Sequence, residues 1–196
     1  MTKSRKTEFG DFWRDGSPEQ VHGLLGNASW AWLMWVFTLE QSAAVIALSA
    51  SYIERRSDET MMPGVFAVRA MLMGYAIECA LKGFWVSKGN VIASNGRYVR
   101  IPNTGDHNLL QISQAVGFEP TAKEADVLKR LSIFATFAGR YPIAKTSEGM
   151  APNNIPAVGP VDVAFFSKQD FRVTQSVLNK IIALISGKKR RLTPHL

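Results

Sequence analysis

The stretch Pro63–Val86, PGVFAVRAMLMGYAIECALKGFWV, decides the fold because it is long, apolar and nearly free of charge. Its opening proline suits the first turn of a helix, where the missing N–H costs nothing. A helix this apolar belongs in the middle of a bundle, where every buried charge must find a partner. We therefore predict a central helix from Pro63 to about Lys88. The charged residues within this stretch are Arg69, Glu78 and Lys82.

The charges of this central helix predict how it pairs with its surroundings. Glu78 and Lys82 are four residues apart in the favourable order, so they can form an ion pair along one face. Arg69 lies more than two turns before Glu78 and needs a partner from another element. Gly74 and Gly83 lower helix propensity but allow a neighbouring helix to approach closely.

A second long helix is predicted over Ala28–Arg56. It is apolar nearly all round and begins with three tryptophans, Trp30, Trp32 and Trp35. Its length would allow a membrane span, but the carboxylate of Glu40 in its middle argues against a lipid environment. We therefore predict a buried bundle helix with an aromatic face used for core or dimer contacts, and no membrane span.

Shorter elements are marked by their capping and turn residues. Asn95-Gly96 lies between two short apolar runs and predicts a β-hairpin with a type I′ turn over residues 91–101. The segment Ile143–Ser167 is rich in Pro, Asn and Gly and predicts a long loop that is functional or mobile. Further helices are predicted to start after Ser17, after Asp106 or Asn108, after Thr121 with Glu124 completing its capping box, and near Ser167 or Asp170.

Together these elements predict an all-α protein, an antiparallel helical bundle of about five helices with a small β-hairpin insertion. A length of 196 residues suits one domain. We expect residues 1–27 to form a basic and polar lead with a short helix. Residues 28–187 would form the single bundle, and residues 188–196 a basic tail.

The net charge of +7 comes from the two ends of the chain. Lys3, Arg5 and Lys6 precede the first acid, no acid follows Lys188–Arg191, and the sequence between the two ends is neutral. Basic ends speed encounters with phosphate polymers without specifying one, or simply keep the chain soluble. The single cysteine, Cys79, excludes a disulfide framework and a cysteine-based zinc site, and it suits a reducing cytoplasm. We expect Cys79 to be an inert core residue, and we expect no cofactor and no metal.

The sequence contains no P-loop, dinucleotide fingerprint, zincin helix or nucleophile elbow. It does contain two arginine–histidine spacings, Arg100…His107 and Arg190…His195, of a kind that can cleave RNA without metal. In such a pair a neutral histidine removes the proton of the 2′-hydroxyl, and the arginine holds the phosphate. If the protein is an enzyme, we therefore expect a metal-independent endoribonuclease with His107 and Arg100 as catalytic residues.

Three short motifs occur in order along the chain: Tyr75–Gly83 (YAIECALKG), Gly105–Leu110 (GDHNLL) and Gly139–Pro142 (GRYP). In this order and spacing they resemble the HEPN superfamily, named for a nucleotide-binding domain of higher eukaryotes and prokaryotes, over about Pro63–Pro142. The resemblance implies an α-helical bundle, often dimeric, from toxin–antitoxin or defence systems, and many such proteins are RNases. Members that cleave RNA carry their arginine and histidine on a late helix. The last predicted helix here has Arg172 and no histidine, so we do not expect cleavage of the family type.

The shared residues predict a polar cleft able to bind phosphate, RNA or a nucleotide, formed by Glu78, Lys82, His107, Arg140 and Tyr141. His107 would face the middle of the central helix, and Arg140 would be a second partner of Glu78. The same residues could instead form a buried network that only fixes packing, as in a protein-interaction or scaffold module. A third hypothesis is a small-ligand binder with an aromatic pocket. The resemblance and the excess apolar helix surface also predict a homodimer, and a toxin–antitoxin role would add a partner protein.

Overall fold

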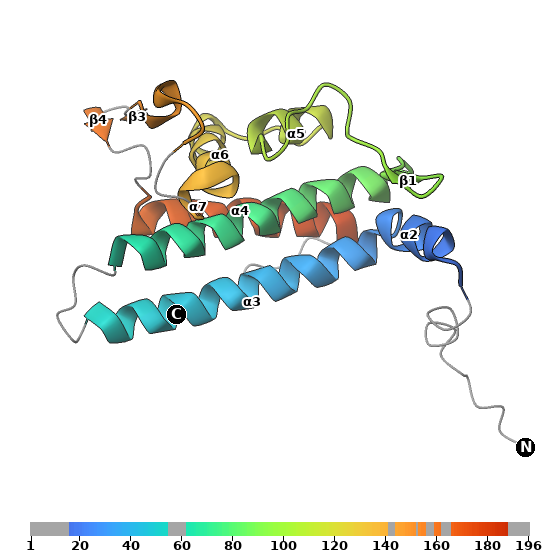
Figure 1. Ribbon diagram of the computed structural model, residues 1–196, viewed down its shortest axis with the longest axis horizontal. Helices are drawn as coiled ribbons and strands as arrows, with labels where there is room; N and C mark the ends of the chain where they lie inside the picture. Colours follow the sequence, from blue (N-terminus) through green and yellow to red (C-terminus); the bar gives the residue numbers. More distant parts are fainter. Residues whose placement is uncertain are drawn as a thin grey trace, which may run out of the picture.

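The computed structural model describes residues 16–54, 62–140, 144–151, 153–155, 159–161 and 166–187. It confirms the predicted fold class, a mostly helical protein with a small β-hairpin (Figure 1). The elements are, in chain order, α2 (Pro18–Gly26), α3 (Ser29–Glu54), α4 (Met62–Ser87), β1 (Ala93–Ser94), β2 (Arg97–Tyr98), α5 (Leu109–Ala115), α6 (Ala122–Ile133), the π-helical η2 (Phe134–Ala138), the 3-10 turn η3 (Ser147–Met150), β3 (Asn153–Ile155), β4 (Gly159–Val161) and α7 (Lys168–Ser186).

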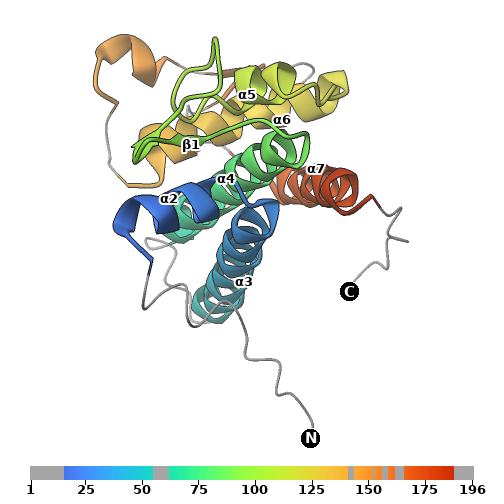
Figure 2. The ribbon, with the colours of Figure 1, turned by 90° about the vertical axis from the view of Figure 1, so that its right-hand side faces the viewer.

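Helix α4 is the centre of the molecule, as its sequence predicts. It contacts α3, α5, α6, η2 and α7, and Figure 2 shows it with α3 on one side and α5 and α6 on the opposite side. Ala76, Ile77 and Leu81 are fully buried along its length. A side chain at Gly83 would come within 3.1 Å of the Cβ of Trp32, so this glycine allows α3 and α4 to pack closely.

Helix α3 has the predicted length, but the prediction that it is a buried bundle helix is wrong. Val36 and Ala43 are buried against the rest of the molecule, whereas the exposed fractions of Trp35 and Leu48 are 61% and 72%. Helix α3 packs chiefly on α4 and lies at the outside of the bundle (Figures 1 and 2). With one principal neighbour, a helix that is apolar all round buries only one stripe and leaves the opposite face in solvent.

Two helices in the described part of the chain are long and apolar enough to cross a membrane by length and composition, over Ser29–Ser49 and Gly64–Ser87. Core helices of soluble proteins meet the same criteria. The window in α4 is 44% buried inside the protein, which fits a core helix, whereas the window in α3 is only 17% buried. Within the described residues, the outward face of α3 is therefore an apolar surface that no other element covers.

The predicted helix caps are present. Ser17, Thr121 and Ser167 each form a capping box with the residue three positions later, and Asn108, not Asp106, caps α5. Gly187 ends α7 in the left-handed conformation with φ of 60°.

The predicted β-hairpin is also confirmed, with Asn95 and Gly96 both at positive φ in the tight turn. Its place on the bundle is set by Asn27, just beyond α2. The Asn27 Oδ1 accepts hydrogen bonds from the backbone of Ile92 and Ala93 at 2.8 and 3.0 Å, and its Nδ2 donates to the carbonyl of Ala93 at 2.7 Å. This clamp lets a two-stranded ribbon, which is marginal alone, stay ordered.

The predicted long loop between α6 and α7 contains more regular structure than expected. Its described residues include the turn η3 and an antiparallel hairpin in which Asn153 pairs with Val161 and Ile155 pairs with Gly159. The strands are three residues long and rich in Asn, Gly and Pro, so they carry no alternating apolar pattern from which a strand could be predicted.

Candidate functional site

The predicted ion pair of the central helix lies at the base of the site. Lys82 Nζ is 2.7 Å from Glu78 Oε1, one turn along α4, and their side chains are only 16% and 10% exposed. The ammonium group of Lys82 also faces two aromatic rings, 5.6 Å from the centre of Trp32 and 5.2 Å from that of Tyr98. A buried carboxylate, a hairpin tyrosine and an α3 tryptophan therefore surround one cation.

The second partner of Glu78 is His107, as its predicted position facing the central helix implies. Its Nδ1 lies 2.8 Å from Glu78 Oε2, and its ring centre is 5.5 Å from that of Tyr75. His107 itself sits in the loop before α5 with φ of 60°, a left-handed conformation that is uncommon for a residue with a side chain. The strained backbone turns the imidazole toward α4, where the carboxylate holds it.

The electrostatics of Glu78 indicate the direction of its hydrogen bond with His107. Burial alone would raise the pKa of Glu78, but the charge of Lys82 and the hydrogen bonds from Lys82 and His107 outweigh it and lower this pKa. For Lys82 the directions are reversed: burial alone would lower its pKa, but the charge and hydrogen bond of Glu78 raise it. An ionised carboxylate only accepts hydrogen bonds, so the His107 Nδ1 carries the hydrogen and donates it. The other ring nitrogen, Nε2, is left to act on a ligand.

We expect the lowered pKa of Glu78 to appear in the pH dependence of stability. A carboxyl group whose pKa is lower in the folded chain contributes stability above its ordinary pKa of 4.5, and that stability is lost as the pH falls through the folded value. Urea unfolding from pH 6 to pH 3 should therefore show a weaker loss of stability in Glu78→Gln than in the wild type. A Glu119→Gln variant, altered at an exposed loop carboxylate, should lose as much unfolding free energy between pH 6 and pH 3 as the wild type does. An equal loss in all three proteins would contradict the role of Glu78.

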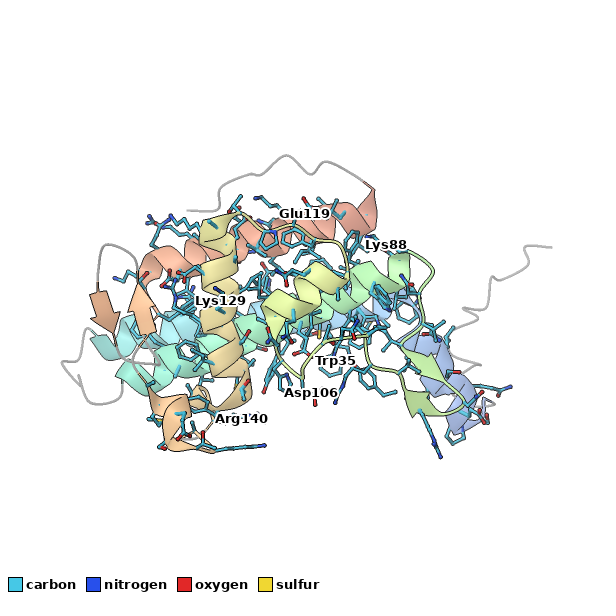
Figure 3. All side chains as sticks on the ribbon, turned by 90° about the horizontal axis from the view of Figure 1, so that it is seen from above. Trp35, Lys88, Asp106, Glu119, Lys129 and Arg140 are labelled. Carbon is cyan, nitrogen blue, oxygen red and sulfur yellow. The ribbon has the colours of Figure 1, made fainter. Side chains whose placement is uncertain are left out.

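His107 lies on the wall of a cleft of about 860 Å³, which we call the His107 cleft. The start of α5, one face of α6 with η2, and the segment before η3 enclose it; Figure 3 shows Asp106 on the loop before α5 and Lys129 on α6. The wall is mixed, with apolar surface from Ile133 and Phe137. Its polar and charged side chains are those of Asp106, His107, Asn108, Lys129, Ser132, Thr136, Lys145 and Thr146.

The α6 wall of this cleft was not predicted from the sequence, although a signal for it is present. Lys129, Ser132, Ile133 and Thr136 follow the spacing of one helix face. Ser132 also accepts a hydrogen bond from the backbone N–H of Leu109 at 3.0 Å, which holds the start of α5 against α6. The contribution of Lys145 to the same cleft depends on tertiary packing and had no local signal.

One of the predicted site residues, Arg140, differs from expectation, and another, Tyr141, is not tested. Arg140 is not a partner of Glu78, whose two carboxylate oxygens bind Lys82 and His107. The Arg140 guanidinium donates instead to the carbonyls of Ala135 and Thr136, at the end of its own helix. A helix end supplies such acceptors locally, so the arginine need not reach across the bundle. The predicted site residue Tyr141 lies outside the described residues.

The predicted catalytic pair is not assembled at the His107 cleft. Arg100 forms an exposed salt bridge of 2.9 Å with Asp106 and does not line this cleft. It borders a narrow crevice with Glu78 and Lys82 on the other side of the loop. The other arginine–histidine spacing, Arg190…His195, lies outside the described residues.

Other chemistries find little support in the described residues. Burial raises the pKa of the Cys79 thiol to about 11, so it is protonated at neutral pH and is not an activated nucleophile. No cluster of three or more His, Cys, Asp or Glu side chains suited to a metal ion occurs among the residues that the structure places. The arrangement is instead one of a fixed imidazole and two lysines around a partly apolar cleft.

Comparison with known proteins adds no relative to this description. No family model, no curated protein and no solved structure matches the chain.

Proposed function

We propose that this protein binds RNA or a nucleotide in the His107 cleft. The observation that carries the proposal is the His107 imidazole, which the buried Glu78 holds by Nδ1 while the ring lies on the wall of the cleft. An imidazole fixed in this way can contact a phosphate oxygen through Nε2 without first losing rotamer freedom. An imidazole with hydrogens on both ring nitrogens can donate to Glu78 from Nδ1 and to a phosphate oxygen from Nε2.

The composition of the cleft supports a phosphate-bearing ligand with an apolar or aromatic part. Lys129 and Lys145 come from two different segments of the wall, and the one carboxylate that lines it, Asp106, is paired with Arg100. Ile133 and Phe137 offer apolar surface on which a base could stack. A volume of about 860 Å³ falls in the range of small-molecule sites, which suits one nucleotide or one unit of a polymer.

Binding without cleavage is the form of the proposal that the geometry favours. Cleavage of RNA by a histidine needs a second group that stabilises the charge developing on the phosphate, and Arg100 is engaged instead in its salt bridge with Asp106. A cytoplasmic location and a place in a prokaryotic defence or toxin–antitoxin pair belong to the same proposal. They rest on the single cysteine and on the resemblance to the HEPN superfamily.

The scaffold hypothesis is favoured for part of the polar cluster. Glu78 and Lys82 are nearly buried and bonded to each other, which is the behaviour of a packing network. His107, at 34% side-chain exposure, is the member that reaches the cleft. We therefore assign ligand contact to His107 and the lysines, and a positioning role to Glu78 and Lys82.

The test is a titration with fluorescently labelled single-stranded RNA and, separately, with AMP and ATP. Loss of one charge-assisted contact to phosphate removes about 1.5–3 kcal/mol, so Lys129→Ala should weaken binding roughly tenfold to a hundredfold. His107→Ala should weaken it to a similar degree. Lys123→Ala is the matched control, because Lys123 is an exposed lysine on α6 that does not line the cleft.

The outcomes separate a site from general attraction of a basic protein. Equal losses in Lys129→Ala and Lys123→Ala would assign binding to overall charge and contradict the proposal. Absence of binding to all three probes would remove it. Incubation of the wild type and His107→Ala with total RNA completes the test, because cutting by the wild type alone would make His107 catalytic.

A further inference from the structure

The outward face of α3 is an apolar surface that nothing in the described part of one chain covers. We define it by its exposed side chains from Trp30 to Ser49, none of which is charged. Glu40, the only acid in this part of the helix, points to the flank of the bundle, where Gln175 of α7 donates a hydrogen bond to it at 2.6 Å. The large apolar members of the face are Trp30, Met34, Trp35, Phe37, Val45 and Leu48.

The polar members of this face are already satisfied within the helix. The hydroxyls of Thr38, Ser42 and Ser49 each donate to the carbonyl four residues earlier, at 2.9–3.1 Å. A hydroxyl bonded in this way can be covered by a partner without losing its hydrogen bond. Gln41 is the one residue of the face whose side-chain amide would need a partner when covered.

The size of the face fits an interface. With exposed fractions of 39–72% and ordinary side-chain areas of about 150–250 Å², the six large members expose roughly 600 Å² together. This value is at the upper end of the largest apolar patch on a typical monomer, which is about 300–600 Å². It also supplies most of the roughly 800 Å² that each partner contributes to a standard interface.

The arrangement of residues along the face is self-complementary for antiparallel packing. Gln41 lies at the middle of α3, the bulkier side chains Trp30, Met34 and Phe37 precede it, and Ala44, Val45 and Leu48 follow it. If two copies cross antiparallel with Gln41 on the axis, Phe37 lies opposite the smaller Val45, and Met34 lies opposite Leu48, which is of similar size. The two Gln41 amides can then donate and accept across the axis.

From this geometry we propose that the outward face of α3 is the contact surface of a twofold homodimer in which two α3 helices pack antiparallel. A twofold contact needs a patch that is complementary to itself, and the central glutamine with opposed halves meets that requirement. A lipid surface would use the same apolar side chains but would leave the Gln41 amide without a partner in hydrocarbon. The proposal is independent of the His107 cleft, which lies on the opposite side of α4.

The test measures the mass of the full chain in solution by sedimentation velocity over a concentration series. Wild-type protein should be a dimer, whereas Met34→Glu and Leu48→Lys should each be monomeric, with the dimer Kd raised roughly thirtyfold or more. The double variant, Met34→Glu with Leu48→Lys, should recover the dimer, because each glutamate then faces a lysine of the partner. Leu184→Lys is the matched control, since Leu184 is an exposed leucine on α7, and it should stay dimeric.

Each result bears on the proposal. A monomeric double variant would exclude the antiparallel pairing of positions 34 and 48, and a dimeric Met34→Glu would exclude this face as the interface. A wild type that is monomeric in solution would overturn the proposal, and its flotation with phospholipid vesicles would assign the face to lipid instead. Circular dichroism of each variant confirms that the fold is kept, which is expected because the altered side chains are exposed.

Discussion

Replacement of Glu78 with leucine is expected to lower the free energy of unfolding by about 3–5 kcal/mol. The carboxylate is the acidic partner of Lys82, whose side chain is 16% exposed, and it also accepts the hydrogen bond of His107. Without it an ammonium group would stay nearly buried with only aromatic faces beside it. Removing one member of a buried ion pair costs more than the pair contributes, because the remaining charge is no longer compensated.

The measurement is urea unfolding followed by circular dichroism at pH 7. The control is the double variant Glu78→Leu with Lys82→Met, which removes both charges and fills their space with apolar atoms. Its loss should be clearly smaller than that of Glu78→Leu, since an apolar pair of similar volume can replace a buried ion pair at little cost. A double variant as unstable as the single one would show that the charge of Lys82 is not the cause.

The contrast between α3 and α4 shows what helix periodicity can predict. Both helices are apolar nearly all round, and the sequence predicts their lengths and the Glu78–Lys82 pair correctly. Their difference lies in how many neighbours each one has, and that number is a property of the assembled bundle. A pattern of apolar residues reports that a surface can be buried and does not report what covers it.

The same distinction holds at the candidate site. The meeting of His107 with α4 followed from its place where a loop reaches the start of a helix that packs on α4. The partners of Arg140 and Arg100 did not follow, because each arginine finds acceptors within a few residues of its own position. Local acceptors compete with distant ones at no cost in chain entropy, and spacing alone cannot rank the two.

A second ion pair, which was not predicted from the sequence, is expected to be as important for stability as the first. Arg130 on α6 is 5% exposed, and its Nη2 lies 2.6 Å from Oδ1 of Asp170 on α7. The other oxygen of Asp170 accepts hydrogen bonds from the backbone and hydroxyl of Ser167, both at 2.8 Å, and so completes the capping box of α7. One carboxylate therefore joins α6 to α7 and also stabilises the first turn of α7.

Asp170→Ala is expected to lower the free energy of unfolding by about 4 kcal/mol or more, from the loss of a buried ion-pair partner together with a helix cap. Asp126→Ala is the matched control, because Asp126 binds the same guanidinium at 3.0 Å but its side chain is 41% exposed. The free energy of unfolding of that variant should fall by less than about 1 kcal/mol, because exposed ion pairs contribute little to stability. The two carboxylates share one arginine, but Asp170 is buried and also takes part in the capping box of α7, so urea unfolding of the two variants measures these two contributions together.

The consequence of this pair extends to the His107 cleft. Lys129 precedes Arg130 on α6 and lines the cleft, so loosening the joint between α6 and α7 should weaken ligand binding along with stability. Asp170→Asn keeps an oxygen for one of the two contacts and should fall between the wild type and Asp170→Ala. Similar losses in Asp170→Ala and Asp126→Ala would contradict the assignment, because Arg130 would then be compensated from solvent and the joint would not depend on Asp170.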